Sequence, residues 1–170
     1  MRLAISVMGL LILAACRGET PPPATAPAPA APAEAAPAIS QGLSWTTQVG
    51  GAGVALILSG PDGAPLLRLA CVRDPAAMTV TAERFTAIGS EERLTLGLDD
   101  EAFTFVADPT AERPIGVEAT APISQDLLAR LPTANAVSAV YGQQRIGPHI
   151  PPDPEAARRF VSACREIGAR

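Results

Sequence analysis

The chain has 170 residues, and its 17 acidic side chains outnumber its 13 basic ones to give a formal net charge of −4 at pH 7. All of these basic residues are arginines, and only Arg158 and Arg159 are adjacent. Proteins that bind nucleic acids usually present a cluster or stripe of basic side chains. The composition therefore argues against a nucleic-acid-binding protein.

The first residues have the pattern of a secretory signal. Arg2 is followed by an apolar run, 3–15, in which Ser6 is the only polar side chain. A helix that spans a bilayer needs about 20 residues, so this run is too short for one. A short apolar run behind a positive charge is typical of a signal peptide. We expect residues 1–15 to be removed.

The end of this run is more specific. Leu13, Ala14, Ala15 and Cys16 match the four positions of the lipobox, so the segment resembles the signal of bacterial lipoproteins. The resemblance implies that the Cys16 sulfur receives a diacylglyceryl group. The signal is then cut just before Cys16, and the amino group of Cys16 that this cleavage frees is acylated. These lipid chains anchor the protein in a membrane. In Gram-negative lipoproteins an Asp after the cysteine tends to retain the protein in the inner membrane. Residue 17 is Arg, which favours the outer membrane, facing the periplasm.

Residues 16–38 are expected to form the lipidated cysteine and a tether. From residue 19 to 38 the chain consists almost entirely of Pro and Ala. Proline fixes φ and removes a backbone donor, so helix and sheet do not propagate well. The segment favours polyproline II, and 20 such residues span at most roughly 60 Å.

The remaining residues, 39–170, are long enough for one domain with its own core. Short apolar or alternating runs separated by turn residues predict strands. We expect an α+β domain, mainly β, with an antiparallel sheet or a small sandwich or barrel-like body, a short helix and a C-terminal helix. The expected strands are 43–49, 54–58, 67–71, 78–81, 94–98, 103–105, 115–119 and 136–141, with a loop at 109–114.

Two helices are indicated by capping residues. Ser124 can cap a short helix at 125–131. Asp153 and Pro154 are typical of the start of a longer helix that ends at Gly168. Apolar residues three and four apart predict the buried face of this second helix: Ala157, Phe160, Val161, Cys164 and Ile167.

The three cysteines are an odd number, which needs an explanation in an exported protein. Lipidation of Cys16 leaves Cys71 and Cys164. Cys71 shares strand parity with Leu67 and Leu69, and Cys164 lies on the apolar face of the last helix. Because both point to the core and an oxidising compartment preserves disulfides, we expect them to be bonded.

Residues with catalytic or metal-binding chemistry are sparse. His149 is the only histidine and lies in a proline-rich segment. Ser90 follows a glycine but lacks the second glycine of a nucleophile elbow. The acids at 99–101 lack the spacing of a calcium loop and are interpreted as turn residues that solvate a hairpin tip. We therefore expect no catalytic residue, no cofactor and no metal site.

The segment 141–151 is distinctive because it is polar and carries amide and aromatic side chains. One interpretation is an ordered crossover loop beneath the last helix, and the other is a recognition loop. The candidate binding residues are Tyr141, Gln143, Gln144, Arg145 and His149.

Three functions remain open from the sequence. The first is a lipid-anchored envelope protein with a non-enzymatic role, either binding a protein or cell-wall partner or structural. The second is a lipoprotein inhibitor of a cell-wall-degrading enzyme such as lysozyme, although the inhibitory loop motif of such proteins is not visible. The third is a hydrolase with dispersed carboxylates.

Overall fold

The computed structural model describes residues 41–108 and 116–169. The expected signal peptide (1–15), Cys16 and the tether (16–38) lie outside the described residues, as does the loop expected at 109–114.

The described residues form nine strands in a single sheet, and every neighbouring pair is antiparallel. This confirms the expected α+β fold, mainly β. The strands are β1 (Ser44–Gly50), β2 (Gly53–Ser59), β3 (Pro65–Arg73), β4 (Ala76–Ala82), β5 (Arg93–Leu98), β6 (Glu101–Ala107), β7 (Val117–Ala121), β8 (Val137–Tyr141) and β9 (Gln144–His149).

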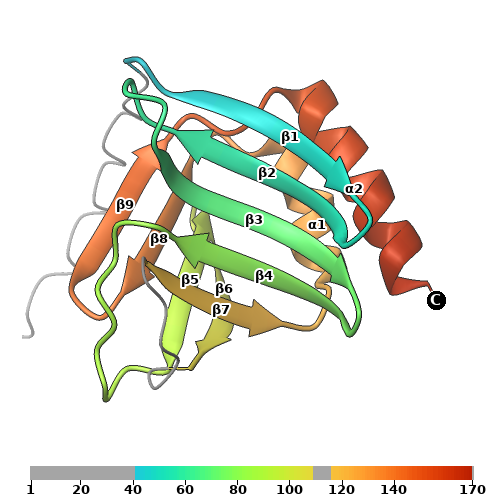
Figure 1. Cartoon of the computed structure of the whole chain (residues 1–170). Helices are drawn as coiled ribbons and strands as arrows, with labels where there is room; N and C mark the ends of the chain where they lie inside the picture. Colours follow the sequence, from blue (N-terminus) through green and yellow to red (C-terminus); the bar gives the residue numbers. More distant parts are fainter. Residues whose placement is uncertain (1–40, 109–115, 170) are drawn as a thin grey trace, which may run out of the picture. The chain divides into compact units, whose positions relative to one another are not determined.

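The order across the sheet is β1-β2-β3-β4-β7-β6-β5-β8-β9. After β4 the chain forms β5 and β6 further along the sheet and returns with β7 beside β4, which is a Greek-key connection. In Figure 1, strands β5, β6, β8 and β9 run steeply across the direction of β1–β4. The right-handed twist between neighbours therefore accumulates into a strongly coiled sheet.

Alternation of side chains decides which face of each strand is buried. In β5 the three leucines at 94, 96 and 98 are at most 2% exposed, as their spacing predicts. In β6, Phe105 is buried, whereas Phe103 is half-buried at the border of the core. The same parity in β3 directs Leu67, Leu69 and Cys71 to the inner face of the sheet.

Two α-helices and one 3₁₀ turn, η1 (Leu131–Thr133), complete the described fold. Helix α1 (Gln125–Arg130) begins at Ser124, whose hydroxyl accepts a hydrogen bond from the Leu127 N–H. Helix α2 (Pro154–Gly168) begins at Asp153, whose carboxylate accepts from the N–H groups of residues 155 and 156. Both caps satisfy donors that a helix end otherwise leaves unpaired. The expected helices and caps are confirmed.

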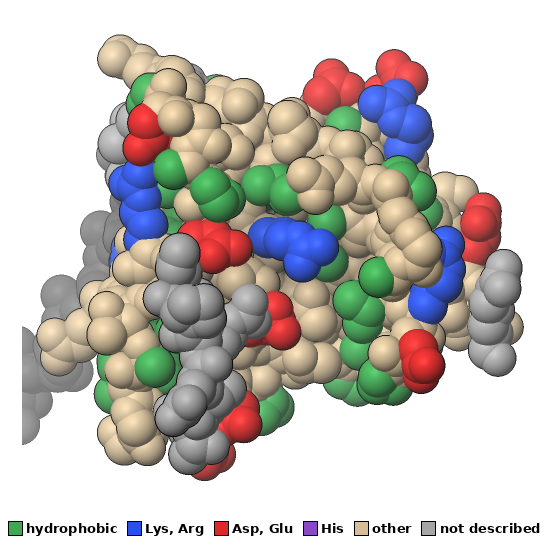
Figure 2. Space-filling view, in the orientation of Figure 1, with side chains coloured by type: hydrophobic (Ala, Val, Ile, Leu, Met, Phe, Trp, Pro, Cys, Tyr) green, Lys and Arg blue, Asp and Glu red, His purple; other side chains and the backbone are tan. Residues whose placement is uncertain are grey.

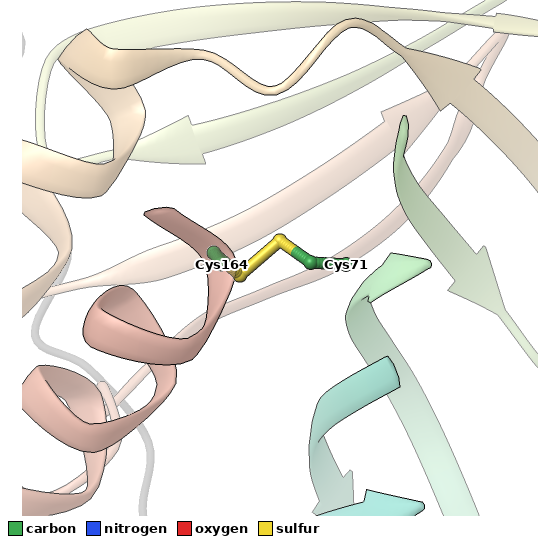
Figure 3. Close-up of a disulfide and its surroundings, with 2 residues drawn as sticks. All are labelled: Cys71 and Cys164. Atoms are coloured by element: carbon green, nitrogen blue, oxygen red, sulfur yellow. A yellow bond between two sulfur atoms is a disulfide. The ribbon is translucent and has the colours of Figure 1, made fainter. Parts of the chain in front are cut away.

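Helix α2 packs against β2, β3 and β4 with the apolar stripe that its spacing predicts. Within this contact Cys164 is bonded to Cys71 of β3, with 5.4 Å between the two Cα atoms (Figure 3). Both cysteines are completely buried. The bond joins the C-terminal helix covalently to the core strands, and the expected pairing is confirmed.

One structural expectation is wrong. The segment 141–151, expected to be a loop, contains strand β9, which pairs with β8 as a hairpin. The sequence suggested a loop because Gly147 and Pro148 interrupt any alternation of apolar residues. Proline is tolerated here because β9 lies at the edge of the sheet, where one side of the strand needs no donor.

Candidate binding groove

The predicted binding residues all belong to the β8–β9 hairpin. Its two turn residues are Gly142 and Gln143, and Tyr141 faces Gln144 across the ladder. Gly142 has a φ of +57°, a conformation that glycine adopts without steric cost. This turn exposes Gln143 to solvent and sets the register in which residues 144–149 are presented.

Tyr141 is fully buried. Its hydroxyl donates to the Glu91 carbonyl at 2.8 Å and accepts from the Ile88 N–H at 3.2 Å. The ring stacks on Phe85, with 6.4 Å between the ring centroids. Tyr141 therefore fixes the long connection between β4 and β5 onto the hairpin, and its ring is not available to a partner.

Gln144 has a similar structural role. Its amide nitrogen donates to the Thr86 carbonyl and its amide oxygen accepts from the Thr86 N–H, both at 2.7 Å. The Gln144 amide thus does for Thr86 what a neighbouring strand would do, because it satisfies both the N–H and the C=O of that residue. The β4–β5 connection is held to β9 by this amide and by Tyr141.

Between that connection and β9 lies a groove of about 490 Å³. Arg145, which is exposed, and His149, which is half-buried, contribute to it from β9. Arg84 lines the opposite side, and the other lining residues include the buried apolar side chains Leu66, Phe85 and Ile146. The groove thus combines apolar contact area with basic groups, a combination suited to a partner with acidic groups beside apolar ones.

The charges in the groove are unevenly distributed. Arg84 lies 3.6 Å from the Asp62 carboxylate, and both side chains are more than half exposed, so solvent screens this pair. Arg145 forms no ion pair with any residue that the structure describes. The exposed guanidinium of Arg145 therefore gives the groove a local positive charge in an acidic chain.

A second groove, of about 590 Å³, separates α2 from α1 and η1. Its exposed lining carries both signs of charge, from Arg158, Arg165 and Glu166. None of the predicted binding residues lines it.

The acids at 99–101 have a larger structural role than expected. The Asp99 carboxylate accepts hydrogen bonds from the N–H groups of Asn135 and Ala136, at 2.8 and 2.9 Å. Glu101 lies 3.2 Å from the guanidinium of Arg130. Instead of only solvating a hairpin tip, these side chains fasten the β5–β6 turn to the segment that contains α1 and enters β8.

The structure brings Arg145 and His149 into one groove but gives Tyr141 and Gln144 internal contacts. Sequence reasoning missed Arg84, Phe85 and Leu66 as groove residues. They come from β3 and the β4–β5 connection, and no local pattern reveals that these segments lie against β9.

Among the residues described, no helix has the length and apolar character needed to cross a membrane. Nor do three potential metal-binding side chains converge anywhere in 41–108 or 116–169. Comparisons of the chain with protein-family models, with curated proteins and with solved structures find no match.

Proposed function

We propose that this chain is a lipid-anchored protein of the bacterial cell envelope whose domain binds a partner without catalysing a reaction. The observation that carries the proposal is the sequence Leu13-Ala14-Ala15-Cys16 at the end of a short apolar run. A diacylglyceryl group and an acyl chain on Cys16 together give stable anchoring, because each buried CH₂ contributes roughly 0.8 kcal/mol.

The disulfide supports export of the domain. The chain has three cysteines, and the bond between Cys71 and Cys164 uses two of them. Disulfides of this buried, structural kind persist in oxidising compartments such as the periplasm and are rare in the cytosol. Cys16 is left as the single cysteine outside this bond, as lipidation requires.

The groove beside β9 supports a binding role. Its floor is apolar, Arg145 is exposed at its side, and two internal hydrogen-bonded side chains hold its walls in place. A site whose walls are fixed in advance loses little conformational entropy on binding. We propose that it receives acidic groups of an envelope protein or of the cell wall, with the Pro/Ala-rich tether extending from the outer membrane into the periplasm.

The anchor is tested by expressing the full chain and its Cys16→Ser variant in bacteria with a labelled fatty acid. The native chain should incorporate the label and sediment with outer membranes, whereas the variant should do neither. Equal membrane sedimentation of the two chains would contradict the anchor. Recovery of the labelled native chain with inner membranes would refute the outer-membrane assignment alone.

Partner binding is tested by placing a photoreactive residue at position 143, the exposed turn of the hairpin, in the full chain. Irradiation of living cells should produce one defined crosslinked product, which mass spectrometry then identifies. The same residue at exposed Ser162, in the groove beside α2, is the matched control. Capture of a lysozyme would select the inhibitor hypothesis, and equal products from both positions would contradict a specific groove.

A further inference from the structure

One edge of the sheet has no neighbouring strand in the part of the chain that the structure describes. Strand β1 has β2 on one side and no strand on the other within the described residues. In an antiparallel ladder, alternate residues direct their N–H and C=O groups away from the paired neighbour. From the unpaired edge of β1 and the sequence of that strand we propose that two copies of this chain associate by antiparallel pairing of β1 with β1, which makes one continuous sheet.

The two edges of the sheet differ in a way that supports this proposal. Monomeric proteins usually block an edge with charged residues, proline or irregular pairing. Strand β9 has all three: Arg145, Pro148 and a register shift against β8. Strand β1, Ser-Trp-Thr-Thr-Gln-Val-Gly, has no charge and no proline, and its pairing with β2 is regular over all seven residues.

The surface around β1 agrees with its sequence. In Figure 2 the strip over β1 shows neither acidic nor basic side chains. The described large apolar side chains that remain exposed include Val49, at 77%, and Ile150, at 47%. Ile150 lies against a side chain of β1, because its carbonyl accepts a hydrogen bond from the Trp45 indole N–H at 2.8 Å. Exposed apolar groups thus lie on or against β1, and the strand itself carries no charge.

A two-fold axis through Thr47 gives a register in which β1 is complementary to itself. Trp45 of one copy then faces Val49 of the other, and Thr46 faces Gln48, so that no charge is buried. Pairs of an aromatic with a β-branched side chain stabilise antiparallel sheets, and Val49 would be covered. Such an isologous contact uses each edge once and closes at two copies.

The size of the contact predicts a reversible dimer. Seven residues in a strand extend about 23 Å, at roughly 3.3 Å per residue. A single strand pair of this length buries less area than the about 1,200–2,000 Å² typical of stable complexes. The dimer does not depend on the groove beside β9 or on the lipid anchor, so it can be tested separately from the proposed function.

The test uses charges at two exposed positions of β1, Thr46 and Gln48, which face each other in the proposed register. One variant carries Thr46→Lys and Gln48→Lys, and the other Thr46→Glu and Gln48→Glu. Two full-length copies with different C-terminal tags are expressed in the same cells, crosslinked briefly and captured through one tag. The measured quantity is the amount of the second copy recovered with the first.

We expect native copies to be recovered together. When both copies carry the same charged variant, recovery of the second copy should fall roughly tenfold, because like charges then face each other at two positions. The lysine variant mixed with the glutamate variant should regain recovery to the native level, since both facing pairs become opposite in charge. This recovery also shows that the variants fold. Absence of native association, or equal recovery in all four combinations, would overturn the proposal.

Discussion

At the scale of single residues, Asp99 links two segments that are distant in sequence. It adopts a φ of +55° in the β5–β6 turn, and its carboxylate accepts two backbone N–H groups that lie just before β8. We predict that Asp99→Ala lowers the free energy of unfolding by about 1–3 kcal/mol, because two charge-assisted hydrogen bonds are lost. Urea denaturation measures this change.

Two matched variants separate this effect from a general loss of charge in the turn. Asp100→Ala removes a neighbouring exposed carboxylate and should change stability by less than about 0.5 kcal/mol. Asp99→Asn keeps a hydrogen-bond acceptor and tolerates a positive φ, so its loss of stability should lie between those of Asp99→Ala and Asp100→Ala. Equal losses for Asp99→Ala and Asp100→Ala would contradict the structural role of Asp99.

Gln144 is the second residue with a local role that can be measured. Its amide satisfies both backbone groups of Thr86, so Gln144→Ala should release the β4–β5 connection from β9. We predict faster hydrogen exchange at the Thr86 amide and at neighbouring amides of that connection, with little change in the core strands. Gln143→Ala, at the exposed turn, should leave exchange at Thr86 unchanged, and uniform acceleration across the sheet would refute the local role.

At the scale of elements, helix α2 is joined to the sheet by its apolar stripe and by the disulfide. The bonded cysteines are separated by 93 positions in sequence, so the bond constrains a large part of the unfolded chain. We predict that Cys71→Ala combined with Cys164→Ala lowers the free energy of unfolding by about 2–5 kcal/mol. Thermal unfolding of the double variant beside the native chain measures this.

Cys16→Ser is the control for that pair, because it removes a cysteine outside the bond. It should leave the midpoint of thermal unfolding unchanged. A reducing agent should lower the midpoint of the native chain and leave the midpoint of the double variant where it was. If the reducing agent left the unfolding midpoint of the native chain unchanged, the bond would have no stabilising role.

How well an element is predicted from sequence depends on how local its signal is. The apolar stripe of α2 and its Asp153 cap lie within the helix and its first turn, and both are confirmed. The leucines of β5 and the Cys71 parity are equally local. Strand β9 was missed because an edge strand that carries Gly147 and Pro148 shows little alternation.

At the scale of the whole molecule, the strand order could not be obtained from the sequence. The insertion of β7 between β4 and β6 results from long-range pairing, and no local pattern encodes it. The same long-range folding brings Arg84 to Arg145 and His149 in one groove. The sequence singled out the residues of the hairpin as a group, and their role in binding stays a prediction. Only the fold shows that Tyr141 and Gln144 make internal contacts while Arg145 is exposed.

The topology also places the two proposed contact surfaces at opposite ends of the strand order. The partner groove is built on β9, and the self-association edge is β1. Copies joined through β1 would use no residue that lines the groove, so the dimer could engage two partners or two sites of one polymer. Binding at both sites of a linked pair raises the apparent affinity without any new contact.

The charge of the groove gives the final prediction. Arg145→Glu reverses the charge at the one arginine of the groove that forms no ion pair with any described residue. We expect this variant to reduce crosslinking from position 143 about tenfold. Arg165→Glu makes the same charge change in the groove beside α2 and should leave that crosslinking unchanged. Both variants should keep the β1 association, because neither residue belongs to β1. If Arg165→Glu abolished crosslinking while Arg145→Glu preserved it, the partner would bind beside α2, and its assignment to the groove beside β9 would be wrong.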